Sequence, residues 1–484
     1  MNRIARGVAF SASFQRSLAR IAGVGCLLTD PADCWPYGYD NSRRHALPQA
    51  VVFATDEPRI AALVRLCAEA GIPLIARGRG TGTTGATVPD RGGIVLSFER
   101  MDRIIRLVPA DRLAVVQPGV LNATLQQALE PLGFFWPPDP TSAATCTIGG
   151  NLAYNSAGPR AVKYGTPRDN TLGLRAIDGR GEPFRTGVLT TKGVVGYDLT
   201  RLVIGSEGTL ALITEATLKL TPLPEAKRTL RAAYTDIHAA AAAVSAIMAQ
   251  PVTPCALEFM DAAAIATVRH FTEIDLPEGA GALLMIEVDG PRACIDEALN
   301  AVSAAAQVAG LLELRRADSA DEVAALWKAR KSLSPTLRHI APKKINEDVV
   351  VPVSRMGEFI EGLERLSHET GIRIVNFGHA GNGNIHVNLL IDPDDAGEVE
   401  RARDCLDAMF SLVLRLGGTL SGEHGVGLEK RDFVGREIDP VALRLMSEIK
   451  RGFDPAGILN PGKGAARPYR LNDNEEAPVS ELEL

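Results

Sequence analysis

Residues 72–98 read IPLIA RGRGTGTTG ATVPDRGG IVLSF: an apolar run, a glycine-rich loop, a polar stretch and a second apolar run. Inside the loop, G-T-G-T-T-G matches the G-x-G-x-x-G dinucleotide fingerprint, which in a Rossmann unit leads directly into a long helix. Here Pro89 and two further glycines follow instead. The pattern therefore predicts a strand at 72–76, a glycine turn and a strand at 94–98, and it excludes a Rossmann unit at this point.

The same loop can bind a diphosphate through its backbone. Successive N–H groups in a tight turn form a concave nest for an anion, and Arg77 and Arg79 add positive charge. A plain tight turn is the alternative, but many glycines beside two arginines favour the anion site. Upstream, residues 55–70 carry apolar residues at helical spacing, so we expect a helix that is capped by Thr55 or Asp56.

Length and composition are those of an ordinary globular protein. A chain of 484 residues is expected to form two or three domains. The net charge of −6 gives no sign of nucleic-acid binding, and no apolar run reaches the length of a membrane span. The seven cysteines are scattered and form no C-x-x-C pair. This favours reduced thiols in the cytoplasm and argues against an iron–sulfur cluster in this chain.

The N-terminal stretch mixes arginines with small apolar residues, a weak imitation of a targeting peptide. Its apolar part, around residues 21–28, is short, and arginines are spread through the region. We interpret this stretch as an N-terminal helix. The sequence is compatible with a cytoplasmic protein that contacts the inner face of a membrane at its periphery.

The second half carries the residues with the most distinctive chemistry. Residues 377–390 read FGHAGNGNIHVNLL, and residues 421–427 read SGEHGVG, which together hold three of the chain's eight histidines. Two neutral imidazoles and a carboxylate are a usual three-ligand set for a catalytic metal with an open position. In a strand over the apolar run 385–391, His386 and Asn388 would point to the same face. The alternative is a glycine-rich turn with incidental histidines.

Three further stretches could line a cofactor groove, although each alone is more often a loop than a site. Residues 136–142 (WPPDPTS) are stiff and end in polar side chains. Residues 147–158 (TIGGNLAYNSAG) offer small residues, hydroxyls and amides near an exposed backbone. Residues 204–210 (IGSEGTL) open an expected strand at 211–220.

Taken together, these motifs resemble a known family. R-G-x-G-T-G-x-x-G, P-D-P-T-S, T-I-G-G-N and G-S-E-G-T-L resemble the FAD-binding half of the vanillyl-alcohol oxidase/p-cresol methylhydroxylase superfamily. G-H-x-G-x-G-N-x-H-x-N, S-G-E-H-G-V-G and the terminal I-L-N-P-G-K of residues 458–463 resemble its D-2-hydroxyacid dehydrogenase branch. That branch includes FAD-linked D-lactate and D-2-hydroxyglutarate dehydrogenases and the large glycolate oxidase subunit. The resemblance covers about residues 35–465.

The resemblance implies an α+β fold: a two-subdomain FAD-binding domain of the vanillyl-alcohol oxidase/p-cresol methylhydroxylase type and an antiparallel-sheet α+β cap domain. T-P-L-P at 221–224 is a plausible boundary between them, and beyond it strand-like runs alternate with alanine-rich helical stretches. We expect an N-terminal helical segment over 1–34, the FAD-binding domain over 35–224, the cap and substrate domain over 225–415, a C-terminal segment returning to the flavin over 416–470 and a flexible tail over 471–484.

The resemblance also assigns site residues. A divalent metal, expected to be zinc, would be held by His379, His386 and Glu423. His424 would be the general base, Arg330 would clamp the substrate carboxylate, and Asn388 would bond the substrate or orient the metal ligands. FAD would be bound by Arg77, Gly78, Arg79, Gly80, Thr81, Gly82, Thr84, Gly85, Pro140, Thr141, Ser142, Gly149, Gly150, Asn151, Ser156, Gly208, Ile213 and Asn460. Some superfamily members carry a histidine bonded covalently to FAD at the Thr81 position, so noncovalent FAD is expected here.

One departure bears on the substrate. D-2-hydroxyglutarate dehydrogenases resemble K-Y-D before a strand that ends in proline, and that lysine helps to hold the second carboxylate. This chain has N-E-D at 346–348, with Lys343 and Lys344 close but out of register. A substrate with one carboxylate, such as D-lactate, is therefore favoured over D-2-hydroxyglutarate.

The expected activity is oxidation of a small D-2-hydroxy acid to the 2-oxo acid, with hydride passing to flavin N5, a metal lowering the pKa of the hydroxyl group and a histidine taking its proton. The expected electron acceptor is a quinone, a cytochrome, an electron-transfer flavoprotein or an iron–sulfur subunit. The chain could also form a homodimer. The alternatives are a noncatalytic FAD-binding subunit of a glycolate-oxidase-like complex, and a metal hydrolase, which leaves the N-terminal half unexplained.

Overall fold

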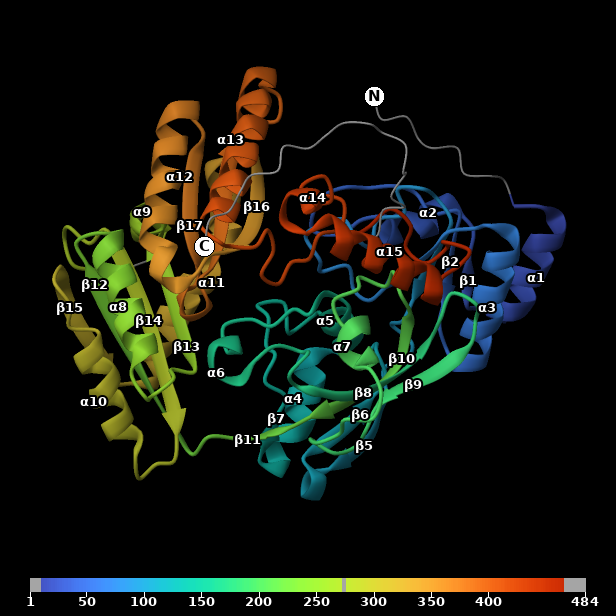
Figure 1. Ribbon diagram of the computed structural model, residues 1–484, viewed down its shortest axis with the longest axis horizontal. Coiled ribbons are helices and arrows are strands. Elements are labelled where there is room, and N and C mark those ends of the chain that lie inside the picture. The colour runs from blue at the N-terminus through green and yellow to red at the C-terminus, as the bar shows by residue number, and fades with distance from the viewer. Residues whose placement is uncertain (1–9, 272–275, 465–484) are drawn as a thin grey trace.

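The computed structural model describes residues 10–271 and 276–464 (Figure 1). The expected tail at 471–484 lies outside the described residues, as do the outermost parts of the expected N-terminal and C-terminal segments. The described chain forms two halves. A helix-covered sheet stands on one side of the view, and two smaller sheets with their helices stand on the other (Figure 1).

The first sheet contains the glycine loop and has the order β1-β2-β4-β3. Its parallel core is β2 (Ala50–Phe53), β4 (Ile94–Ser97) and β3 (Leu74–Arg77). Helix α3 (Glu57–Ala70) connects β2 to β3; the Asp56 side chain caps it by accepting from the Arg59 N–H, and Gly71 ends it in a left-handed conformation. Between β3 and β4 the chain forms no helix. The predicted strand–loop–strand is confirmed.

The arginine-containing N-terminal stretch forms one helix, and the apolar residues 23–28 lie beyond its end. Helix α1 (Ala12–Ala22) ends at Gly23, and β1 (Leu27–Leu28) then pairs antiparallel with β2, before the short α2 (Pro31–Cys34). Gly23 and Gly25 both have positive φ, 82° and 70°, which a right-handed helix cannot accommodate. The arginine-containing helix is therefore α1 itself, whose Phe14 and Leu18 pack on the first sheet's core.

The second sheet is fully antiparallel in the order β5-β6-β10-β8-β9. Its central strand, β10 (Leu212–Lys219), matches the strand expected at 211–220. Small helices and a two-stranded ribbon cover it, and Trp136 is fully buried in the shared core. The other elements of this part are β5 (Ile104–Val108), β6 (Leu113–Val116), β7 (Phe134–Phe135), β8 (Thr171–Ile177), β9 (Pro183–Gly187), β11 (Thr221–Pro222), α4 (Asn122–Leu129), α5 (Ile148–Tyr154), α6 (Ala161–Tyr164) and α7 (Leu199–Val203).

The third sheet is the antiparallel cap sheet, in the order β15-β12-β14-β13-β17-β18-β16. Helices cover both of its faces (Figure 1). One face packs on α8 (Ile237–Ala249), α10 (Ile295–Ala305), α12 (Met356–Thr370) and α13 (Ala396–Arg415). The other packs on α9 (Ala262–Phe271) and α11 (Ala320–Ile340). The strands are β12 (Ala226–Tyr234), β13 (Ala256–Asp261), β14 (Ala282–Gly290), β15 (Leu311–Ala317), β16 (Lys343–Val350), β17 (Arg373–His379) and β18 (Asn384–Ile391).

After α13, residues 416–464 leave the cap sheet and run back across the first half, through α14 (Val434–Glu437) and α15 (Pro440–Phe453) (Figure 1). Leu459 makes a parallel bridge to Leu74 of β3, which attaches this segment to the strand before the glycine loop. None of the helices in the described ranges is long and apolar enough to cross a bilayer.

Candidate active site

One cavity of about 370 Å³ lies between the glycine loop and the cap sheet. Its first wall comes from the N-terminal half and combines loops with residues of β3, α5 and β10. Its second wall consists of cap residues and the 421–427 loop. Fourteen of the residues expected to bind FAD line the first wall: Arg77, Gly78, Arg79, Thr81, Gly82, Pro140, Thr141, Ser142, Gly149, Gly150, Asn151, Ser156, Gly208 and Ile213. Arg330, His386, Glu423 and His424 line the second wall.

The glycine loop is compressed against its neighbours, so its conformation depends on the absence of side chains. Gly80 has φ 65°, and a Cβ there would lie 2.7 Å or less from the Arg77 guanidinium. A Cβ on Gly82 would lie 2.6 Å from the Tyr154 hydroxyl oxygen. The wall therefore presents backbone rather than side chains to the cavity, which suits a diphosphate approached by N–H groups.

The Arg77 side chain does not have the role expected from the sequence. Its guanidinium is buried and donates to the backbone carbonyls of Tyr39, at 2.6 Å, and Pro36, at 3.3 Å. Burial lowers the pKa of Arg77, although Asp40 opposes that shift. Arg77 thus ties residues 36–39 to the loop, and half-exposed Arg79, 3.4 Å from Glu99, carries the loop's outward-facing charge.

Four residues expected to bind FAD lie beside the cavity rather than in its lining: Gly80, Thr84, Gly85 and Asn460. The Thr84 hydroxyl donates to the His424 carbonyl at 3.3 Å. The Asn460 amide donates to the carbonyls of Ala86, at 2.9 Å, and Glu207, at 2.7 Å. These side chains connect the 421–427 loop and the C-terminal segment to the glycine loop.

On the cap wall, one row of side chains crosses four neighbouring strands. Glu258 of β13 pairs in register with His379 of β17, and His386 of β18 pairs with Asp348 of β16. Their strand neighbours, such as Leu257 and Val387, point into the core of the opposite face. Because side chains alternate along a strand, all four polar residues project from the face that α11 covers.

Glu423 of the 421–427 loop joins His379 and His386 of this row, so the three expected metal ligands lie together. Donor atoms of His379, His386 and Glu423 all lie within 4.8 Å of one another. Glu423 Oε1 is 3.3 Å from His379 Nε2 and 3.7 Å from His386 Nε2. The other carboxylate oxygen, Oε2, accepts from the Gly158 N–H at 2.8 Å, so the N-terminal half fixes this side chain too.

The electrostatics of this cluster fit a divalent cation. Burial, together with the neighbouring His379 and His424, holds the pKa of His386 well below its ordinary value, so its imidazole is neutral and can donate a lone pair. Burial would also lower the pKa of His379, but Glu258 and Glu423 outweigh it and raise that pKa to about 10. Two buried carboxylates beside one imidazole favour positive charge at this point, and metal binding at such sites releases protons.

Arg330 of α11 reaches the same cluster. It is 8% exposed, its Nε lies 2.8 Å from Glu258 Oε2, and its guanidinium stacks over the Phe377 ring at 4.6 Å. Its side chain lines the cavity beside Lys331 and Ser334. Arg330 therefore shares the cavity lining with His386, Glu423 and His424.

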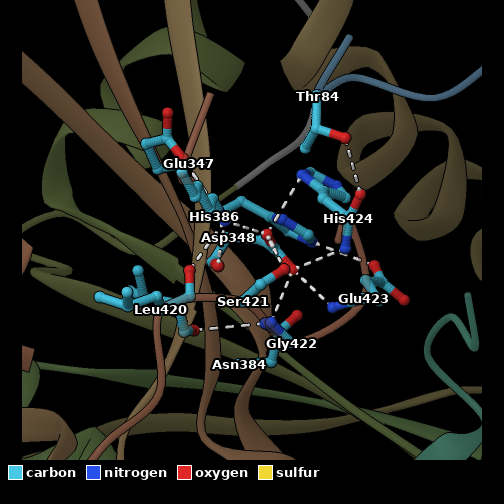
Figure 2. Close-up of polar contacts among 12 residues, drawn as sticks. Thr84, Glu347, Asp348, Asn384, His386, Leu420, Ser421, Gly422, Glu423 and His424 are labelled. Carbon is cyan, nitrogen blue, oxygen red and sulfur yellow. Dashed lines mark hydrogen bonds and ion pairs between the residues drawn. The ribbon is translucent and has the colours of Figure 1, made fainter. Parts of the chain in front are cut away.

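His424 is held by a buried charge cluster centred on Asp348 (Figure 2). Asp348 Oδ2 accepts from the backbone N–H groups of residues 422, 423 and 424 at 2.6–3.0 Å. Its Oδ1 lies 3.5 Å from His424 Nδ1 and accepts from Lys430 Nζ at 2.6 Å. Burial opposes ionisation, but His424 and Lys430 hold the pKa of Asp348 well below its ordinary range. With Nδ1 toward Asp348, the other imidazole nitrogen is left for the cavity.

Asn388 lies behind this wall and does not line the cavity. It is fully buried, and its amide donates to the carbonyls of Val375 and His386, both at 3.0 Å. Asn388 therefore holds the backbone of the two strands at His386, and it has no contact with the cavity through which it could bind a substrate.

Sequence reasoning missed Glu258, Asp348 and Lys430. Glu258 stands in the largely apolar run 256–260 without a motif, Asp348 is the last residue of N-E-D in the polar strand β16, and Lys430 follows S-G-E-H-G-V-G closely in sequence. For Glu258, a charged residue within an apolar strand was the available signal, since such residues are rarely buried without a partner.

The part of the cavity wall next to Arg330 bears on whether a substrate with a second carboxylate can bind. Ser334 and Asn346 line the cavity there, and Lys344 donates to Ser334 Oγ at 2.6 Å. Burial, followed by the charges of Arg338 and Arg43, lowers the pKa of Lys344 to about 8. The lysine of this strand is therefore held by Ser334, and an uncharged amide stands at position 346.

Comparisons with known proteins agree with this geometry. Residues 223–464 match the family model described as FAD linked oxidases, C-terminal domain, and residues 48–187 match that of the FAD binding domain. The fold is similar to that of p-cresol methylhydroxylase with substrate bound, with a TM-score of 0.76, 19% identity, and coverage of 93% of this chain and 96% of that one. The expected fold class is confirmed.

Curated relatives span nearly the whole chain. Glycolate oxidase subunit GlcD of Bacillus subtilis (strain 168) is 38% identical over 90% of this chain and 93% of its own length. D-lactate dehydrogenase of Anaerostipes hadrus is 34% identical, covering 86% and 90% respectively. D-2-hydroxyglutarate dehydrogenase of Stutzerimonas stutzeri (strain A1501) is 32% identical, covering 91% and 96%. The chain belongs to this family of FAD-linked oxidoreductases, whose members include hydroxyacid dehydrogenases.

Proposed function

We propose that the protein oxidises a small D-2-hydroxy acid, with a D-lactate-like acid favoured, to the 2-oxo acid. The observation that carries this proposal is the convergence of a guanidinium, a His/His/Glu set and a further histidine on one cavity wall opposite the glycine loop. A carboxylate, a hydroxyl group and its proton each have a matching group there. The metal-hydrolase alternative has no support from the FAD-linked family to which the chain belongs.

Each residue has a defined task in this proposal. Arg330 binds the substrate carboxylate through its terminal nitrogens, for which a planar guanidinium is well suited. The ring nitrogen of His424 that faces away from Asp348 accepts the hydroxyl proton, and the Asp348 carboxylate stabilises the resulting imidazolium. When bound, FAD supplies the hydride acceptor, and a divalent cation held by His379, His386 and Glu423 supplies a Lewis acid for the hydroxyl oxygen.

The preference for one carboxylate rests on the far wall. A second substrate carboxylate would face Asn346 and Ser334, while Lys344 is already engaged by Ser334. We further propose that FAD is noncovalent, because Thr81 has no nucleophilic ring or thiol, and that the metal is zinc. The free thiols of all seven cysteines agree with the cytoplasmic location that we propose.

The electron acceptor is proposed to be a quinone, a cytochrome, an electron-transfer flavoprotein or an iron–sulfur partner subunit. One relative is itself named as a subunit. Because of that name, the alternative to an enzyme that acts alone is a noncatalytic FAD-binding subunit of a larger complex.

The test is anaerobic bleaching of the enzyme's flavin absorbance with matched D and L enantiomers of lactate, 2-hydroxybutyrate and 2-hydroxyglutarate, alongside glycolate. The proposal expects bleaching by D-lactate and D-2-hydroxybutyrate, and little by the L forms. Flavin that binds but is bleached by none of these acids would favour the noncatalytic subunit. Faster bleaching by D-2-hydroxyglutarate than by D-lactate would overturn the one-carboxylate preference.

A further inference from the structure

Glu258 is a buried carboxylate whose two oxygens serve two different parts of the cap wall. It is 2% exposed in the middle of the cap sheet. Its Oε1 lies 2.5 Å from His379 Nδ1, and its Oε2 lies 2.8 Å from Arg330 Nε. Neither the glycine-rich motifs nor the His/His/Glu set includes this residue.

We infer that Glu258 is a positioning residue that holds the metal ligand His379 and the carboxylate clamp Arg330 in one fixed geometry. The inference rests on the proposed function and adds to it a single connection between two sites. Glu258 itself touches neither substrate nor cation. It acts through the two side chains that do.

On the His379 side, Glu258 determines which ring nitrogen carries hydrogen. A carboxylate beside Nδ1 holds a proton there, so Nε2, 3.3 Å from Glu423 Oε1, is the nitrogen that would bind the proposed cation. Carboxylates behind metal-bound histidines commonly fix the tautomer and the ring orientation in this way.

On the Arg330 side, Glu258 engages the inner nitrogen of the guanidinium. The ion pair is made at Nε, and a guanidinium has two further nitrogens that can make a bidentate contact with a carboxylate. The Phe377 ring, under the guanidinium at 4.6 Å, holds its plane. Substrate binding therefore does not have to break the ion pair.

The connection suits the chemistry of a 2-hydroxy acid. Such a substrate carries its carboxylate and its hydroxyl group on neighbouring carbon atoms, so the groups that bind them must stand at a fixed, short separation. One carboxylate with two oxygens sets that separation between Arg330 and His379. Catalytic groups that are misplaced by about 1 Å can lose on the order of a hundredfold in rate.

The test is Glu258→Gln, which keeps the shape but can satisfy only one of the two partners as an acceptor. We expect zinc affinity to fall by roughly tenfold to a hundredfold. We expect KM for the 2-hydroxy acid to rise by roughly tenfold in the same variant, while the flavin-to-protein ratio stays that of the wild type. Zinc affinity is measured by calorimetric titration of chelator-treated, FAD-loaded protein.

Glu287→Gln is the matched control. Glu287 is 4% exposed, stands on the neighbouring strand β14 and accepts from Trp327 Nε1 of α11 at 2.8 Å. It therefore ties the same helix to the same sheet without touching the site. Arg330→Lys is a second comparison and should raise KM while leaving zinc affinity unchanged, whereas Glu258→Gln should change both.

Zinc affinity and KM in Glu258→Gln that stay within threefold of wild type, or that shift no more than in Glu287→Gln, would overturn the inference. If Glu258→Gln fails to fold, Glu258→Asp keeps the charge but is too short to span both partners, and the same two measurements decide. Wild-type protein that takes up no metal would also overturn it. Wild-type protein that takes up zinc but is bleached by no 2-hydroxy acid would overturn the proposed function alone.

Discussion

The two walls of the cavity are made of different kinds of residues. The wall from the N-terminal half consists largely of glycine, serine, threonine and proline backbone, with its one buried arginine directed at carbonyls. The cap wall consists of charged side chains that hold one another, and Glu258, Asp348 and Lys430 are each 2% exposed or less. A backbone wall should fail when atoms are added to it. A wall of buried charges should fail when one partner is taken away.

The largest expected effect comes from removing a metal ligand from the charged wall. His386→Ala should lose the metal and essentially all turnover while FAD stays bound, because the two walls use different chain segments. Chelator treatment of the wild type should do the same, with zinc or manganese restoring activity. Elemental analysis of fully active enzyme checks this, and less than about a tenth of a metal ion per chain would remove the metal from the proposal.

Next comes the proposed base. His424→Ala should keep metal and flavin but lose on the order of 10²–10⁴ in kcat, the usual contribution of a positioned acid–base group. His238→Ala serves as the control, since that histidine is exposed on α8, away from the cavity. If His424→Ala turns over within about tenfold of the wild type, a group other than His424 accepts the proton of the substrate hydroxyl.

The backbone wall should be sensitive to an added side chain. Gly80→Val forces a β-branched residue to φ 65° and drives its Cβ against the Arg77 guanidinium. Strain of roughly 1–3 kcal/mol corresponds to a loss in flavin affinity of about fivefold to 150-fold. Gly290→Val is the control, because that strand glycine has open space around its Cβ position. Equal flavin-to-protein ratios in the two variants would contradict this account of the wall.

The smallest effect concerns the clamp. Arg330→Lys should raise KM about tenfold with a lesser change in kcat, because an ammonium cannot reproduce the two-pronged contact. Steady-state kinetics with D-lactate and a dye acceptor measure it. If Arg330→Ala leaves kcat/KM within about threefold of wild type, roughly 0.7 kcal/mol, the residue does not hold the reacting carboxylate.

The sequence predicted the features that are encoded locally. The strand–loop–strand around the glycines and the helix that precedes it follow from apolar periodicity, a capping Asp56 and the ending Gly71. The three histidines and Glu423 were identified because each stands in a short motif, and the structure brings them together. These predictions need only nearby residues.

The support behind the site could not be predicted in the same way. Glu258 faces His379 only because β13 and β17 pair in one register, and Asp348 faces His386 only through the pairing of β16 with β18. A shift of one residue would turn each carboxylate into the opposite core. The partners of the Arg77 side chain could not be predicted for a related reason, since the carbonyls of Pro36 and Tyr39 that accept from it are distant in sequence.

The hydrogen bond from the Gly158 N–H to Glu423 Oε2 links the flavin-binding wall to a proposed metal ligand, so binding of FAD and binding of the cation should affect each other. A flavin that orders the 155–158 loop would also orient the Glu423 carboxylate for the cation. Conversely, a cation bound to Glu423 would help to order that loop. Linkage requires the two enhancements to be equal. Loading would then be cooperative: metal-free protein such as His386→Ala would keep its FAD but bind it less tightly than the wild type does.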